Sequence, residues 1–195
     1  MFFKRRKIKR LTKKIKAMQG NRVHNQPRDE VLAKEIAIYH ELGGIYKGLI
    51  GHKHYPYAAE MEEACLRAAA DLEDSNAQYQ LGKQLLEEAK FRDKVQQEVL
   101  FANASNERNM NQLYTEAIVF LESAEKLGHI EARRLHGLCH INGWGLPPDK
   151  DKGFELVVQS IEQENSWDRV PQIFAAIGLN KPEFFSALMQ HRNKS

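Results

Sequence analysis

Residues 128–154 read GHIEARRLHGLCHINGWGLPPDKDKGF, and this stretch decides the fold. Gly143 and Gly145 can adopt positive φ angles, which a tight reversal between two helices requires, and we expect a positive φ at Gly145. The proline pair that follows cannot continue a helix but suits the approach to a new one. Asp149 can accept hydrogen bonds from the free amides at the start of that helix. The stretch therefore predicts two helices joined by a glycine loop.

Helical periodicity continues on both sides of this loop. From residue 29 onward apolar residues recur at helical spacing, and no segment alternates as a strand does. Two helices alone cannot bury their apolar faces, so neighbouring pairs must stack on them. We expect an all-α fold: a short α-solenoid of antiparallel helix pairs, with about three repeats of which the first and last are degenerate, and a basic N-terminal helix or tail. The expected helices cover 31–42, 57–72, 76–101, 112–127, 130–141 and 150–163, followed by two short helices around Ile173 and Phe184.

Small residues recur where the helices of a pair would cross. The order Ala-x-Tyr-x-Leu-Gly at 77–82 is followed, further on, by alanine and glycine at helical spacing. Small side chains let helices approach closely, so we expect Ala69, Ala124 and Ala132 to be buried at crossings. The residues assigned to this framework are Ala77, Leu81, Gly82, Ala124, Gly128, Ala132, Gly137, Gly143, Gly145 and Asp149.

Residues 117–155 resemble the Sel-one-like repeat, an α-solenoid unit related to tetratricopeptide repeats. The two loop glycines, Leu146 and Asp149 stand for the family's loop, and Gly128 closes the preceding helix. The resemblance implies a non-catalytic scaffold or adaptor that binds other proteins. Bacterial members of the family often serve in multi-protein assemblies, including assemblies at membranes and assemblies used in secretion or host interaction.

The chain departs from the family pattern at several positions. His140 replaces a tyrosine, His136 a leucine and Gly153 an alanine in the best-matched repeat. Glu164 occupies the next helix-ending glycine position, so we expect the array to decay beyond that residue.

Other parts of the chain match the repeat less fully. The unit at 75–128 has a polar insertion, 89–115, in place of the glycine loop. The first unit shows only the order Leu-Gly-x-x-Tyr at 42–46 before its alanine-rich helix. The resemblance covers about 29–165, and C-terminal helices within 166–195 are expected to cap the open end.

The first 28 residues form a strongly basic head. They contain 11 of the chain's 29 Lys and Arg and no acid, whereas residues 29–195 hold 18 Lys or Arg against 26 acids, a net charge of −8. We therefore divide the chain into a basic amphipathic segment, 1–28, and a helical repeat domain, 29–195. The residues expected to meet a partner or an anionic surface are Phe2, Phe3, Lys4, Arg5, Arg6, Lys7, Lys9, Arg10, Lys13, Lys14 and Lys16.

Four interpretations of the head stay open. It can be a solvated tail, as charge runs usually are, or a mitochondrial presequence without the usual serines. It can lie in an anionic membrane surface, because Ile8, Leu11, Ile15 and Met18 form one helical stripe, with the Phe2–Phe3 pair beside it. It can dock on an acidic protein; nucleic acid is disfavoured because no aromatic stacking platform accompanies the charge. We expect residues 1–20 to be dispensable for folding but needed for attachment to an anionic lipid or protein.

Composition narrows the class of protein. With 42% apolar and 28% charged residues and no apolar run of the ~20 residues that a membrane span needs, we expect a cytoplasmic protein, with the inner face of a membrane as an alternative location. Two cysteines make no disulfide framework, and no secretory signal is present.

One cluster of side chains resembles a metal-binding or catalytic site. His136, Cys139 and His140 lie at i, i+3 and i+4, a spacing that can gather metal ligands. No fourth ligand is nearby, and both histidines fall at packing positions of the repeat. Cys139 has no recognisable base or orienting group. We therefore expect no catalytic residue, no metal and no cofactor, and a protein that is not an enzyme.

Overall fold

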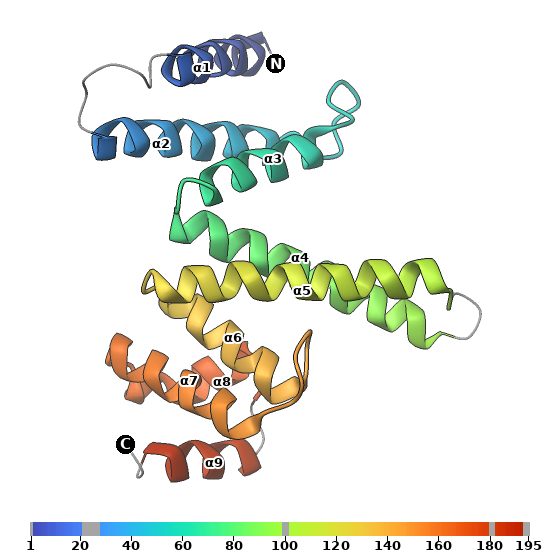
Figure 1. Cartoon of the computed structure of the whole chain (residues 1–195), viewed down its shortest axis with the longest axis vertical. Helices are drawn as coiled ribbons and strands as arrows, with labels where there is room; N and C mark the ends of the chain where they lie inside the picture. The colour runs from blue at the N-terminus through green and yellow to red at the C-terminus, as the bar shows by residue number, and fades with distance from the viewer. Residues whose placement is uncertain (1, 21–27, 99–101, 180–181, 193–195) are drawn as a thin grey trace. The chain divides into compact units, whose positions relative to one another are not determined.

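All regular structure in the described part of the chain is helical (Figure 1). Adjacent helices pack as pairs, which confirms the expected all-α class and its short solenoid of helix pairs. The chain divides into two compact units, Met1–Leu81 and Gly82–Ser195, and each is a body in its own right. The computed structural model describes residues 2–20, 28–98, 102–179 and 182–192.

The first unit is built on α2 (Arg28–Lys47), which packs against both α1 (Phe2–Gly20) and α3 (Ala58–Ala70). A methyl group at Gly43 would lie 3.5 Å from Cβ of Cys65, so α2 and α3 are in contact at the Leu-Gly-x-x-Tyr sequence. Ala69 on α3 is 1% exposed, as expected of a crossing residue. The core of this unit consists of Leu11, Ile15, Leu42, Tyr46 and Cys65.

A long helix, α4 (Ser75–Gln97), begins in the first unit and continues into the second. Asp74 caps it: its Oδ1 accepts a hydrogen bond from the Ala77 amide (2.7 Å), and Nε2 of His40 on α2 lies 2.8 Å from the same oxygen. Ala77 and Leu81 are both fully buried. The start of α4 is therefore tied to α2.

The second unit continues with α5 (Ala104–Lys126), α6 (Ile130–Asn142) and α7 (Lys150–Glu164). A short 3-10 turn, Trp167–Arg169, leads to the two C-terminal helices, α8 (Val170–Ala176) and α9 (Pro182–Arg192). α9 packs on α7, which agrees with a capping role for the C-terminal helices. The core of this unit consists of Leu138, Ile141, Phe154, Val157, Val158, Ile161, Val170, Ile173, Phe174, Leu179 and Leu188.

The glycine loop between α6 and α7 has the predicted geometry. Gly143 ends α6 with φ +73, and Gly145 has φ +70, which confirms the expectation for that residue. A methyl group at Gly145 would lie only 2.9 Å from Cβ of Tyr114 on α5. The Asp149 side chain accepts a hydrogen bond from the Lys152 amide (3.0 Å) and begins α7. Conformation and close packing therefore both require glycine at 145.

The crossing of α6 and α7 is a glycine-to-glycine contact. A methyl group at Gly137 would lie 2.7 Å from the Gly153 carbonyl oxygen. A methyl group at Gly153 would lie 2.5 Å from Cγ1 of Ile141. Glycine at position 153, where the Sel-one-like repeat has alanine, thus has a physical reason, because the backbones approach too closely for any Cβ. Ala124 and Ala132, both fully buried, confirm the other two predicted crossing residues.

Several helix bounds differ from the sequence-based expectation. α2 covers Arg28–Lys47 and is longer at both ends than the expected 31–42, while α4 ends at Gln97, before the expected 101. α5 begins at Ala104, eight residues before the predicted start at 112, because the Asn103 side chain caps it by accepting a hydrogen bond from the Asn106 amide (2.8 Å). The polar insertion is therefore partly helical. At the end of α7 the left-handed residue is Asn165 (φ +49), one position after Glu164, and asparagine tolerates this conformation.

Candidate functional site

The apolar stripe of α1 faces its own unit. Leu11 is 2% exposed and Ile15 is 7% exposed, and Ile8 packs against the same core. The partners come from α2 and α3, and they include Leu42 and Tyr46. The interpretation in which this stripe dips into a membrane is therefore corrected, because the stripe is covered by the chain itself. This burial also argues against residues 1–20 being dispensable for folding.

Polar contacts fasten the same helix to α2. Lys7 Nζ lies 2.7 Å from Glu41 Oε1. Lys4 Nζ donates a hydrogen bond to the Gly48 carbonyl oxygen (3.4 Å). The hydrogen bond from Lys7 is the main reason why the pKa of Glu41 is below its usual value, and the charge of Arg10 adds to the effect. One flank of the basic head is thus partly neutralised by α2.

The other residues predicted to meet a partner lie on the surface of α1. Phe3 is 83% exposed, while the side chain of Phe2 lies outside what the structure describes. The exposed cations of the helix are Lys4, Arg5, Arg6, Lys7, Lys9, Arg10, Lys13, Lys14 and Lys16.

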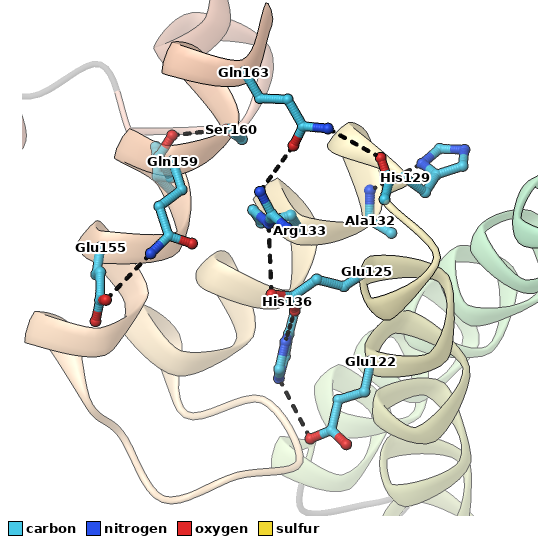
Figure 2. A network of polar contacts seen from close by, with 12 residues as sticks. Glu122, Glu125, His129, Ala132, Arg133, His136, Glu155, Gln159, Ser160 and Gln163 are labelled. Carbon is cyan, nitrogen blue, oxygen red and sulfur yellow. Dashed lines mark hydrogen bonds and ion pairs between the residues drawn. The ribbon is translucent and has the colours of Figure 1, made fainter.

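A polar network joins α5, α6 and α7 in the second unit (Figure 2). His136 is only 5% exposed; its Nδ1 lies 2.7 Å from Glu125 Oε2 and its Nε2 lies 3.7 Å from Glu122 Oε1. Arg133 Nε lies 3.6 Å from Glu125 Oε1, and its guanidinium donates a hydrogen bond to Gln163 Oε1 (2.8 Å). The contacts of His136 and Arg133 with Glu125 join α6 to α5, and the Arg133–Gln163 hydrogen bond joins α6 to α7.

The electrostatics of the network follow from its burial. Burial raises the pKa of Glu125, but the hydrogen bond from His136 and the nearby charges outweigh burial and hold the pKa below its usual value. The His140 ring lies 4.8 Å from the His136 ring. Burial, and then the charges of His136 and Lys152, lower the pKa of His140. The fold therefore lowers the pKa of both Glu125 and His140.

The two thiols are held in their protonated form. Cys139 is fully buried, and burial raises its pKa to about 12. Cys65 is 7% exposed, and burial, together with the charge of Glu62, raises its pKa to about 11. The thiolate is the reactive form of cysteine, so neither side chain has the environment of a nucleophile.

The glycine loop is fixed against the preceding helix pair. Lys90 Nζ on α4 lies 4.0 Å from the centroid of the Trp144 ring, a cation–π distance. Tyr114 on α5 packs under Gly145, and burial, assisted by Asp93, raises the pKa of its hydroxyl to about 12. The loop thus joins α4 and α5 to α6 and α7.

The far end of the α4–α5 hairpin is held together by amides and extends beyond α6 (Figure 1). Asn106, 9% exposed, donates hydrogen bonds through Nδ2 to the Arg92 carbonyl and to Gln96 Oε1, both at 3.0 Å. Gln96 Oε1 also accepts a hydrogen bond from the Asn103 amide (3.2 Å). Phe91 beside this cluster is 65% exposed. Where the structure describes it, at 89–98 and 102–115, the predicted insertion is mostly helical, and it has an exposed aromatic side chain.

Sequence reasoning missed most partners in these networks. Arg133 and Gln163 are 30 positions apart, and nothing in their spacing predicts contact. A signal did exist for His136, because a histidine at a leucine position in a core requires a polar partner. Glu122 and Glu125, one helical turn apart on the preceding helix, share the face that supplies it.

Two further findings apply to the described residues. No group of three or more His, Cys, Asp or Glu side chains among them is arranged to hold a metal ion. In the same part of the chain, every helix is too short or too polar to cross a membrane.

Comparison with known proteins gives no further identification. No protein-family model matches the chain, and no curated protein sequence matches it.

Proposed function

We propose that the chain is a non-catalytic adaptor that binds other proteins through a short α-solenoid of the Sel-one-like repeat type. In this proposal it serves as a subunit of a bacterial multi-protein assembly. Solenoids of this kind offer an extended surface for partners and do not need a catalytic cavity.

The α6–α7 crossing is the observation that carries the proposal. The repeat places small residues at fixed positions of its two helices, and Gly137 and Gly153 occupy such positions where the backbones leave no room for a Cβ. The loop between the helices has two left-handed glycines, and Asp149 caps the second helix. These features support a stacked-repeat role for the pair.

The environments of the reactive side chains support a role without catalysis. Cys139 is buried with a raised pKa. His136 is paired with Glu125 across a helix interface, and His129 Nδ1 caps α6 by accepting a hydrogen bond from the Ala132 amide (3.2 Å). Each of these side chains contributes to packing, to helix capping or to a contact between helices.

The far end of the α4–α5 hairpin is the contact surface that we propose. Phe91 is 65% exposed there, and aromatic residues are enriched among those that dominate binding energy at protein interfaces. The amide contacts of Asn106 and Gln96 keep the surrounding backbone in place. A rigid surface with an exposed aromatic side chain loses little entropy when a partner binds.

Affinity purification of the full chain from its native cell tests the proposal. We expect a stoichiometric complex, with its composition measured by size-exclusion chromatography and light scattering. Phe91→Asp should remove the partner or weaken its binding at least tenfold, since hot-spot residues contribute about 2 kcal/mol or more. Val119→Asp is the matched control, because Val119 is 56% exposed on α5 away from the hairpin end.

Recovery of the chain without any stoichiometric partner, from cells in which it is expressed at its natural level, would contradict the adaptor role. Equal loss of the partner in both variants would contradict the proposed contact surface alone.

A further inference from the structure

One face of α1 carries a row of cations. Arg5, Lys9 and Lys13 follow one another at i, i+4 spacing, and Lys16 extends the row by one more turn. At 1.5 Å per residue the row is ~17 Å long. All four side chains are exposed and lie on the side of the helix away from Leu11. The row is therefore a separate face, distinct from the one that packs on α2.

None of these four cations has an ion pair or hydrogen bond with its side chain in the part of the chain that the structure describes. The opposite flank differs, because Lys7 there contacts Glu41. Like charges at i, i+4 repel one another, so Arg5 and Lys9, and then Lys9 and Lys13, make the free helix less stable. An anionic surface would relieve this repulsion, and its binding would stabilise α1.

We propose that α1 binds an anionic lipid bilayer through the row Arg5, Lys9, Lys13 and Lys16 and lies on the headgroups without inserting. The apolar stripe stays packed on α2, so the attachment is electrostatic. This binding does not require the adaptor function, since lipid alone is the partner.

The composition of the face favours a bilayer over a protein or a nucleic acid. A specific protein interface has an apolar, desolvated centre, and the described side chains of this row offer only cations. A nucleic acid is disfavoured because no aromatic stacking platform accompanies the row. In a planar array of anionic headgroups, the cations of the row find negative charges without a matched spacing. Each Lys or Arg near such a surface adds about five-fold in binding.

Sedimentation with vesicles tests the proposal on the full chain. At low salt we expect binding to phosphatidylcholine vesicles in which about one lipid in three is phosphatidylserine. In about 0.5 M NaCl, where charges are strongly screened, we expect the chain to be released. The variant with Arg5, Lys9, Lys13 and Lys16 all changed to Gln should bind on the order of several hundred-fold more weakly. Vesicles of phosphatidylcholine alone should bind neither protein.

A second variant of equal charge serves as the control. Lys53, Lys83, Lys126 and Lys150 are exposed and lie outside α1, and their joint change to Gln removes the same four charges. This control should keep most of the binding. The row variant should melt at the same temperature as the natural chain or higher, because it loses the like-charge pairs.

Three results would overturn the proposal. Equal weakening in the two variants would show that only net charge matters. Retention in high salt, or on uncharged vesicles, would show insertion instead of surface binding. Tighter binding to a duplex DNA or to an acidic polypeptide than to the vesicles, measured at the same salt, would assign the row to that other partner.

Discussion

The α6–α7 pair and the α1–α2 pair hold their helices together by different means. In the first pair Gly137 and Gly153 bring the backbones into contact, with Val157 fully buried beside them. In the second pair Leu11 and Ile15 fill the space between helices, and charged side chains fasten the edge. One pair depends on the absence of side chains at its crossing, and the other depends on large ones.

This difference determines how well the packing of each helix pair can be predicted from the sequence. A contact between two helix backbones tolerates only the smallest residues at the crossing, so the residue types of the α6–α7 crossing are restricted. An apolar stripe on a basic helix has no such specificity, because a membrane or a neighbouring helix can cover it equally well. The identity of the surface that covers α1 depends on α2 and α3, which lie elsewhere in the sequence.

The largest expected effect comes from the glycine loop. Gly145→Val should lower the free energy of unfolding by about 2–4 kcal/mol, because it adds the strain of a left-handed β-branched residue to a clash with Tyr114. Gly128→Val is the control: Gly128 has φ +85, but no atom lies within 4 Å of its added methyl group. It should cost only the strain, about 1–2 kcal/mol. Urea denaturation of both variants measures the difference, and equal losses would contradict the close packing under Gly145.

The next effect concerns the α1–α2 pair. Leu11→Ala should cost about 2–3 kcal/mol of the stability of the first unit, because it leaves a cavity at a side chain that is 2% exposed. Phe3→Ala, at a side chain that is 83% exposed, should change stability by less than about 0.5 kcal/mol. Hydrogen exchange of the α2 amides reports on this unit directly. Unchanged protection in Leu11→Ala would restore the prediction that residues 1–20 are dispensable for folding.

A third prediction compares the chain with the repeat pattern itself. Gly153→Ala introduces the residue that the Sel-one-like repeat has at this position, yet it should destabilise the second unit by about 1–2 kcal/mol, because Ile141 and the Gly137 carbonyl occupy the space. Gly44→Ala on α2 is the opposite case. No atom lies within 4 Å of its added methyl group, so higher helix propensity should stabilise the chain by up to about 1 kcal/mol. A gain in melting temperature for Gly153→Ala would mean that α6 and α7 are not in backbone contact.

The parts of the fold that local chemistry dictates were predictable. The positive φ of Gly145, the cap by Asp149 and the burial of Ala124 and Ala132 follow from residues close to one another in the chain. The start of α5 was predicted too late, because the cap depends on Asn103 within a polar stretch that reads as a loop. Contacts between residues far apart in the sequence, such as Arg133 with Gln163, depend on how the helices pack, and no local sequence pattern predicts this.

The smallest expected effect is a dependence of stability on pH in the α5–α6–α7 network. Burial and the charge of His136 lower the pKa of His140 in the folded chain. As the pH falls, the unfolded chain therefore takes up its proton at this residue first, near the ordinary value of 6.5. Stability is full above that pH and declines as the pH falls toward the folded pKa. Glu125, whose folded pKa is also lowered, adds a second loss that begins below about 4.5.

His140→Gln should flatten the stability curve between about pH 7 and 5.5, where His140 titrates in the unfolded chain and Glu125 does not. The change should stay below about 1 kcal/mol, since solvent screens a group that is only partly buried. Melting temperatures at three pH values in that window measure it. An unaltered slope in His140→Gln would mean that the proton sensitivity lies outside α6. A flattened slope would show that the α5–α6 joint, unlike the glycine contact of α6 with α7, responds to acid.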